Sequence, residues 1–230
     1  MNTIVTQGIV LRRTNYGEAD RIVTFLTPDN GKISVVVKGV RRLKSKMAGG
    51  IELFSVSNLT FMRGRGELGT LVSAQLTTHY GNIVKNITRV QLGYELIKLL
   101  NDTVEDDAEP AFFSLLQGSF AALDDINISG DLVRMWFVAR MLQATGHMPN
   151  LKTTLDGAPL AADKTYDFDL DSMVFAERPT GDFGQNEIKF MRLLFSDVSA
   201  NVLAAVENVE SYIELIAPLI RIMSANYLHH

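Results

Sequence analysis

The residues of this chain best suited to chemistry are positive charges gathered in one short stretch. Between Asp29 and Glu52 the sequence carries six basic residues and no acidic one: Lys32, Lys38, Arg41, Arg42, Lys44 and Lys46. The first 80 residues hold 11 Lys and Arg against 5 Asp and Glu, whereas the remainder hold 11 against 21. This asymmetry of sign predicts a basic surface for a polyanion on an otherwise acidic chain.

A second pair of basic residues, Arg63 and Arg65, lies in a glycine-rich segment. Residues 64–69 (Gly-Arg-Gly-Glu-Leu-Gly) have the G-x-G-x-x-G spacing of dinucleotide-binding loops. Such a loop must be followed by a helix, because the helix N-terminus faces the pyrophosphate. Here residues 70–72 (Thr-Leu-Val) follow, which is typical of a strand. We therefore interpret the segment as a hairpin turn that adds two guanidinium groups to the basic set.

Residues suited to catalysis are sparse. The chain has no cysteine, which excludes disulfides, thiolate metal sites and cysteine nucleophiles. It contains no serine-hydrolase elbow, zinc-protease helix or Walker loop. Asp167, Asp169 and Asp171 begin like a calcium loop, but Ser172 and Arg178 stand where that loop needs glycine and glutamate. A weak cation site or a nuclease face stays open there, yet the sequence favours a solvated hairpin and a protein that is not an enzyme.

The basic residues lie between short segments with strand character. These segments are rich in β-branched and aromatic residues, and a tight turn at residues 28–31 (Pro-Asp-Asn-Gly) joins the second to the third. Five short strands suit a small barrel, and we predict the OB type for residues 1–80. The predicted strands are residues 3–13, 21–27, 33–37, 53–62 and 70–78.

After residue 80 the apolar periodicity becomes helical. It is lost over residues 151–183, where residues 166–175 predict a small hairpin. The predicted fold class is therefore α+β, with the OB-type barrel followed by a helical domain, residues 81–230, that this hairpin lobe interrupts. The predicted helices are residues 83–101, a helix beginning at Pro110, and residues 129–146, 186–195 and 209–227.

Nothing in the sequence indicates a membrane. No stretch approaches the roughly 20 apolar residues that cross a bilayer. Residues 1–13 alternate in polarity, whereas a secretory signal carries one continuous apolar block. We therefore expect no membrane partner and a cytoplasmic location.

Four N-terminal blocks resemble the bacterial RecO family of recombination mediators, in that family's order and spacing. A fifth block, residues 142–151 (Leu-x-x-x-Gly-x-x-Pro-x-Leu), falls where the family's helical domain leads into its zinc-binding lobe. The resemblance is good over residues 1–80. It rests on the pattern of residue types alone over residues 81–150, and it is weak over residues 151–230. The four blocks are residues 16–23 (Tyr-Gly-Glu-Ala-Asp-Arg-Ile-Val), 27–32 (Thr-x-x-x-Gly-Lys), 38–45 (Lys-Gly-Val-Arg-Arg-x-Lys-Ser) and 63–71 (Arg-Gly-Arg-Gly-Glu-Leu-Gly-Thr-Leu).

The resemblance implies work at DNA breaks and gaps. Such proteins bind single- and double-stranded DNA, anneal complementary strands and associate with a RecR-type partner. They also engage the acidic tail of single-strand-binding protein and help to load recombinase. For that tail we predict Arg134 and Arg140 on the third helix, with Arg134 preferred. For DNA we predict the basic loop residues Lys38, Arg41, Arg42, Lys44 and Lys46, with Arg63 and Arg65 of the glycine-rich turn in support.

The sequence departs from the RecO pattern at its zinc site. Many members hold zinc with four cysteines after the Gly-x-x-Pro segment, whereas residues 152–157 here read Lys-Thr-Thr-Leu-Asp-Gly. We therefore expect no metal or other cofactor, and a lobe held by Tyr166, Phe168, Met173 and Phe175. The alternative function is a protein-docking adaptor whose barrel binds a partner and whose basic loop is incidental.

Overall fold

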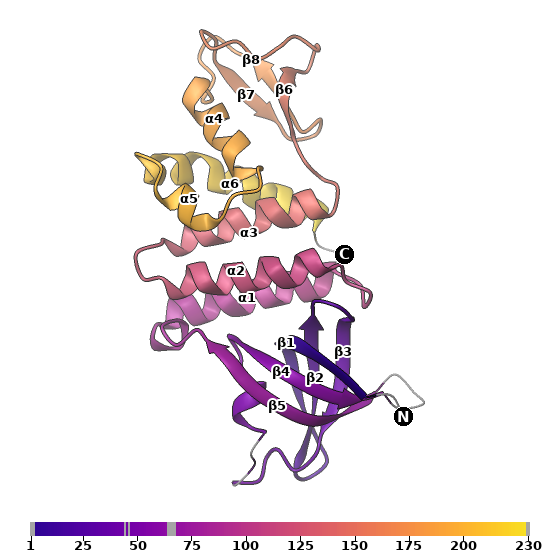
Figure 1. The fold of residues 1–230 in the computed structure, drawn as a ribbon. Coiled ribbons are helices and arrows are strands. Elements are labelled where there is room, and N and C mark those ends of the chain that lie inside the picture. Colours follow the sequence, from indigo (N-terminus) through magenta and orange to yellow (C-terminus); the bar gives the residue numbers. More distant parts are fainter. Residues whose placement is uncertain (1–2, 44, 46, 64–67, 229–230) are drawn as a thin grey trace. The chain divides into compact units, whose positions relative to one another are not determined.

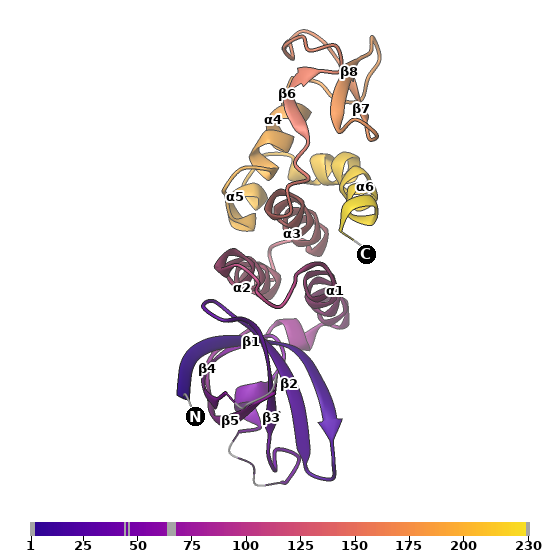
Figure 2. The same cartoon turned by 90° about the vertical axis from the view of Figure 1, so that its right-hand side faces the viewer.

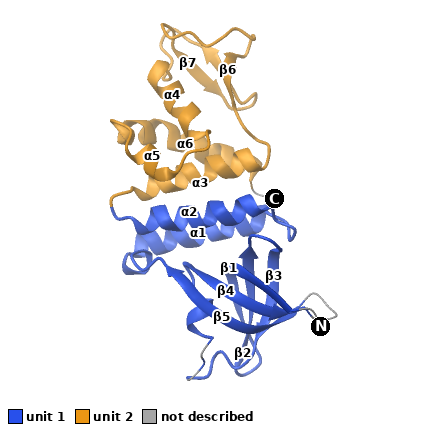
Figure 3. Cartoon of the chain, viewed as in Figure 1, with its two compact units in different colours: residues 1–126 blue, residues 127–230 orange. Residues whose placement is uncertain are grey.

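The computed structural model describes residues 3–43, 45, 47–63 and 68–228 (Figure 1). The chain divides into two compact units, residues 1–126 and 127–230 (Figure 3). The predicted change from strands to helices near residue 80 therefore lies inside the first unit. Among the described residues, no helix combines the length and the apolar composition needed to cross a bilayer.

Five strands form a closed barrel in the first unit, in the order β1-β2-β3-β5-β4. The pairs β1–β2, β2–β3, β4–β5 and β1–β4 are antiparallel. A short parallel pairing of Val35 with Gly69 and Val36 with Thr70 joins β3 to β5 and completes the ring. The predicted five-stranded OB-type barrel is confirmed. Its strands are β1 (Thr3–Tyr16), β2 (Asp20–Thr27), β3 (Gly31–Val37), β4 (Ser55–Met62) and β5 (Gly69–His79).

Alternation of apolar side chains builds the barrel core. Along β3, Ile33, Val35 and Val37 are buried, and the residues between them are half-buried. Phe25 on β2 and Phe61 on β4 meet them inside the barrel and are at most 2% exposed. Each such side chain contributes roughly 1.5–3 kcal/mol by leaving water. The hydrophobic pattern therefore fixes which face of each strand points inward.

Two helices pack with the barrel in the first unit, α1 (Ile87–Thr103) and α2 (Pro110–Asp124). Phe54, at the end of the loop before β4, makes edge-to-face ring contacts with Tyr94 of α1 and Phe120 of α2, both with centroids 5.5 Å apart. Gly93 permits this approach, because a Cβ there would lie 2.5 Å from the Phe54 ring. The first two helices thus share a core with the barrel.

The start of α1 differs from the prediction. Residues Ile83–Lys85 form a separate 3₁₀ turn, η2, and α1 begins after Asn86. The Asn86 side chain accepts hydrogen bonds from the backbone N–H groups of Thr88 and Arg89 at 2.9 and 3.2 Å. An N-cap of this kind starts a new helix. The predicted positions of Pro110 in the first turn of α2 and of Ser129 as the cap of the third helix are confirmed.

The second unit consists of helices around α3 and a small sheet (Figure 2). The fifth helix, α5, and the strand β6 were not predicted, whereas α4 and α6 lie where the periodicity placed them. The elements are α3 (Gly130–Ala144), β6 (Asn150–Thr154), β7 (Tyr166–Asp169), β8 (Val174–Glu177), α4 (Gln185–Leu194), α5 (Ala200–Ala204) and α6 (Val209–Tyr227).

The small sheet is the predicted hairpin, β7–β8, extended by β6 in parallel with β8. Phe175 lies at its centre, with ring centroids 5.1 Å from Phe168, 5.4 Å from Phe183 and 6.2 Å from Tyr166. Phe175 and Tyr166 are fully buried. The expected packing is therefore present for three of the four named residues. Met173 differs, since it is half-buried in the hairpin turn with φ of 53°.

The residues of this lobe do not fit the zinc site that the family resemblance implies. Residues 152–157 supply no thiolate, and the hydroxyl of Thr154 donates to the Asp156 carboxylate and to the carbonyl of Ala158. The Asp156 carboxylate thus accepts hydrogen bonds within its own turn, and these bonds, first of all the one from Thr154, lower its pKa. The lobe is packed around the aromatic side chains of Tyr166, Phe168, Phe175 and Phe183.

Candidate nucleic-acid interface

The basic loop, residues 38–43, is fixed on the turn between β1 and β2. Gly39 has φ of 64°, a conformation that favours glycine, and its N–H donates to Asp20 Oδ1 at 2.7 Å. The backbone N–H of Arg41 donates to the Ala19 carbonyl at 2.9 Å. Val40, 4% exposed, belongs to the barrel core. The loop is therefore anchored by backbone contacts and one buried side chain.

The anchoring leaves the basic side chains of the loop in solvent. Lys38, Arg41 and Arg42 are all exposed. Arg41 Nη1 donates to the Gly17 carbonyl at 3.3 Å, which holds the guanidinium against the β1–β2 turn. Among the described residues, none of these three cations makes an ion pair. Three charges that are not neutralised by carboxylates are available to phosphates.

Strand pairing places the second basic segment away from the basic loop. Val36, two residues before Lys38, pairs with Thr70, and Thr70 pairs with Met62, the residue before Arg63. Met62 also lies opposite Thr3 at the start of β1, whereas the basic loop is bonded to the turn that follows the end of β1, so the exposed Arg63 and the basic loop lie near opposite ends of this strand. We name the end of the barrel formed by residues 16–20 and 38–43 the basic end. The predicted DNA-binding residues Lys44, Lys46 and Arg65 lie outside the described residues.

Lys32 of the same basic run lies at the opposite end of the barrel. Its backbone N–H donates to the Asp106 carbonyl at 2.8 Å and its Nζ to the Asn101 carbonyl at 2.9 Å. Burial lowers the pKa of Lys32, and the carboxylates of Asp106, Asp102 and Glu105 oppose this shift. Lys32 thus joins the β2–β3 turn to the acidic connection between α1 and α2. Charge therefore divides the barrel into a basic end and an acidic end.

In the second unit the two predicted arginines of α3 have different environments. Arg134 Nη1 lies 3.0 Å from Asp131 Oδ1, one helical turn away. Arg140 reaches out of its helix, donating from Nη1 to the Ser196 carbonyl at 2.7 Å and from Nη2 to Asp197 Oδ1 at 2.6 Å. A further bond joins Arg140 Nη1 to Gln143 Oε1 at 3.1 Å. The geometry of Arg140 is that of a residue that positions the segment after α4.

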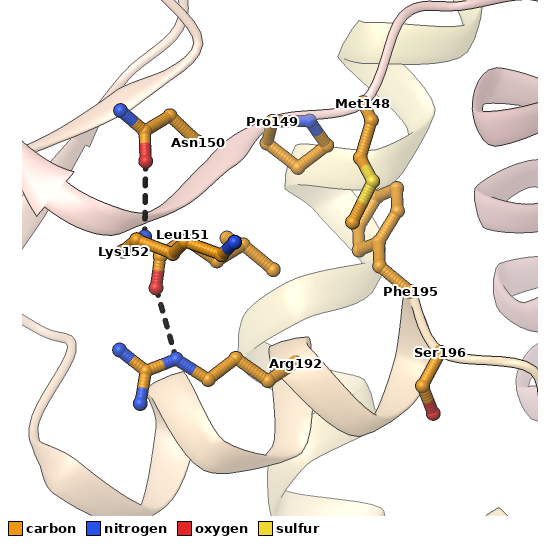
Figure 4. Close-up of a pocket in the computed structure, with 8 residues that line it drawn as sticks. All are labelled: Met148, Pro149, Asn150, Leu151, Lys152, Arg192, Phe195 and Ser196. Atoms are coloured by element: carbon orange, nitrogen blue, oxygen red, sulfur yellow. Dashed lines mark hydrogen bonds between the residues drawn. The ribbon is translucent and has the colours of Figure 1, made fainter.

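A cavity of about 730 Å³ lies beside this segment, between α4 and the start of β6 (Figure 4). Its lining combines apolar side chains with two cations, Lys152 and Arg192, and contains no acid. Arg192 is held by a hydrogen bond of 2.9 Å from its Nε to the Leu151 carbonyl, and within the described residues neither cation makes an ion pair. The lining residues are Met148, Pro149, Asn150, Leu151, Lys152, Arg192, Phe195 and Ser196.

The three aspartates of the hairpin do not converge on a cation site in the described part of the chain. Asp167 lies 3.9 Å from Arg178 Nε, and Asp169 Oδ1 accepts a hydrogen bond of 2.8 Å from the Ser172 N–H. These contacts are those of a surface hairpin, which is the interpretation that the sequence favoured.

Sequence reasoning also missed Tyr16. It placed Tyr16 beyond the end of the first strand, whereas β1 continues to this residue, which pairs with Asp20. Its side chain is 53% exposed at the basic end. Residues 14–16 do not alternate between apolar and polar side chains, so only their hairpin pairing with β2 shows that the strand continues.

A closed OB-type barrel with exposed basic side chains is an architecture used by proteins that bind oligonucleotides, which contact the face of the second and third strands and the β1–β2 and β4–β5 loops. Residues 1–80 match the family described as "Recombination protein O N terminal". The chain is 33% identical over 148 residues to "DNA repair protein RecO" of Dehalococcoides mccartyi, covering 64% of this chain and 58% of the relative. The predicted resemblance to the RecO family of bacterial DNA repair proteins is confirmed.

Two further relatives carry the same description. "DNA repair protein RecO" of Roseiflexus sp. is 35% identical over 147 residues, which cover 64% of this chain and 51% of the relative. "DNA repair protein RecO" of Syntrophus aciditrophicus is 31% identical over 168 residues, which cover 72% and 64%. The matched regions thus span between about half and two thirds of these relatives.

Proposed function

We propose that this chain is a non-enzymatic recombination mediator in bacterial DNA repair that binds single- and double-stranded DNA at the basic end of its barrel. The observation that carries the proposal is the set of three exposed cations on the basic loop that make no ion pair with the described residues, while the acidic connection lies at the other end of the barrel. A polyanion is attracted to the first and repelled from the second. We expect this work in the cytoplasm, where bacterial DNA lies.

Strand annealing requires no catalytic group in this proposal. Exposed cations replace the counterions of each phosphate backbone, and the released ions drive binding with little dependence on sequence. Two complementary strands whose charges are screened can approach and pair. The same surface would contact duplex product through its phosphates, which explains binding to both forms.

Protein partners are proposed for the second unit. The helical part of the chain is acidic, which disfavours DNA there. An acidic tail of single-strand-binding protein needs local positive charge and an apolar contact, and the cavity lined by Lys152 and Arg192 offers both. Arg134 remains the alternative contact, whereas Arg140 is engaged within the unit. A RecR-type partner and the loading of recombinase complete the proposal.

Fluorescence anisotropy of a labelled poly-dT oligonucleotide at several salt concentrations tests DNA binding. Arg42→Glu should weaken binding and flatten the logarithmic salt dependence by at least about 0.7 for each single-strand phosphate that the variant no longer neutralises. Lys98→Glu is the matched control, since it makes the same charge change on α1, and its side chain is 78% exposed. Equal effects of the two variants would contradict the proposed interface.

A protein-docking adaptor is the second candidate function. The uncharged outer surface of β4 and β5 favours it, because neither strand contains a charged residue and Val72 and Leu76 are 49% and 43% exposed. No retardation of DNA by the wild-type protein at low salt would support this candidate and refute the mediator proposal.

A further inference from the structure

The basic end carries one exposed aromatic side chain. Tyr16 is 53% exposed, whereas every other Phe or Tyr among the described residues of the first 80 is buried. Those others, Phe25, Phe54, Phe61 and Tyr80, are at most 7% exposed. An aromatic ring in solvent at the end of a strand contributes little to the core. The ring is therefore accessible to a contact outside the chain.

Tyr16 lies directly beside the charges of the basic loop. The next residue, Gly17, accepts the hydrogen bond from the Arg41 guanidinium. Asp20, its partner across the hairpin, accepts the N–H of Gly39. The backbone on both sides of the tyrosine is thus bonded to the loop. A DNA strand whose phosphates contact the basic loop would therefore bring its bases to the Tyr16 ring.

Nothing in the described part of the chain occupies the Tyr16 side chain. No aromatic ring pairs with it and no hydrogen bond involves its hydroxyl, in contrast to Tyr94 and Tyr166, whose rings contact phenylalanines. The neighbouring Glu18 is exposed and carries the one acidic charge at this turn that is not hydrogen-bonded, since Asp20 binds Gly39. The ring is free to stack, and the cations around it can hold a phosphate.

We propose that Tyr16 is a base-stacking residue that makes the basic end prefer single-stranded over duplex DNA. This inference rests on the proposed DNA-binding function and deepens it. Stacking on an aromatic ring is tolerant of sequence, because every base has a π-face. A base within a duplex is already stacked on both sides, so the ring gains nothing from it. Phosphate contacts serve both forms, whereas Tyr16 serves only the unpaired one.

The test measures the affinity of the full chain for a labelled poly-dT oligonucleotide and for a duplex of equal length. Tyr16→Ala should weaken single-strand binding about tenfold and change duplex binding less than about twofold. It should leave the salt dependence unchanged, because the cations that neutralise phosphates all remain. Tyr16→Phe should bind both as the wild type does. Leu76→Ala is the control for removal of an exposed apolar side chain on the barrel.

A second readout locates the base directly. Photocrosslinking with an oligonucleotide that contains 5-iodouracil should attach the base to the peptide that includes Tyr16. An unchanged single-strand affinity in Tyr16→Ala, or an equal loss for both DNA forms, overturns the stacking inference while leaving the DNA-binding proposal in place. Absence of DNA binding by the wild type overturns both, and so distinguishes the two failures.

Discussion

Replacing Arg140 with alanine should destabilise the second unit instead of removing a partner site. Its guanidinium holds the segment 196–198 against α3 through a hydrogen bond to the Ser196 carbonyl and a contact with Asp197. Trp136 of the same helix donates from Nε1 to the Val198 carbonyl at 2.8 Å. The segment that leads into α5 therefore depends on two side chains of α3, and Arg140 is one of them.

The size of the effect follows from these contacts. A hydrogen bond from a charged donor contributes about 1.5–3 kcal/mol, whereas the ion pair adds little because the Asp197 side chain is 95% exposed. We therefore expect a decrease of about 2 kcal/mol in the free energy of unfolding. For a unit of about 100 residues this lowers the Tm by roughly 8–16 °C.

The assay uses the fluorescence of Trp136, the single tryptophan of the chain, during heating. It reports the second unit selectively, because Trp136 is 6% exposed within that unit and bonded to the segment in question. Arg134→Ala is the matched control, since its contact with the 67% exposed Asp131 side chain is a surface pair. A wild-type Tm for Arg140→Ala, or equal decreases in both variants, would refute the reasoning.

Three other predictions concern titration, the lobe and the cavity. Burial lowers the pKa of Lys32 in the folded chain below 10.5. Between the folded pKa and 10.5 the unfolded chain therefore binds more protons, so the contribution of Lys32 to stability rises with pH in this window. Lys32→Met should flatten the pH dependence of the urea-unfolding midpoint measured across the window. Phe175→Ala should cost about 3–5 kcal/mol in the second unit, while EDTA should leave the wild-type Tm unchanged, and a chelator-dependent Tm would contradict the aromatic core. Arg192→Glu should weaken the binding of a labelled acidic peptide that ends in an apolar residue by about tenfold or more, as measured by fluorescence anisotropy. Arg221→Glu on α6 is the control. Equal weakening by the two variants would place the peptide-binding site elsewhere.

Local patterns in the sequence predicted most of the fold because they reflect local physics. The apolar period of α6 and the caps at Pro110 and Ser129 each depend on neighbours within a few residues. The start of α1 was wrong because residues 83–85 share the helical period, although Asn86 is a strong N-cap residue. The strand β6 was missed because its parallel partner is distant in sequence, and local composition carries no information about that pairing.

The candidate site was predictable in its charges but not in its geometry. Clustering of cations in the sequence identified Lys38, Arg41 and Arg42, which the structure holds on the β1–β2 turn, whereas Arg63 lies beside the start of β1. The same cluster included Lys32, which lies at the other end of the barrel. Tyr16 carries no charge and ends a polar stretch, so only its exposure in the folded chain draws attention to it.

The aromatic centre of the lobe has a consequence for chemical durability. A thiolate zinc site loses its metal when oxidants convert its sulfurs to sulfenic acid or disulfide. In this chain the same region is held by Tyr166, Phe168, Phe175 and Phe183, and no cysteine is present to be oxidised. Peroxide that breaks DNA therefore has no thiol to attack in the lobe. If the chain acts in DNA repair as proposed, this part would stay folded under the oxidative stress that damages DNA.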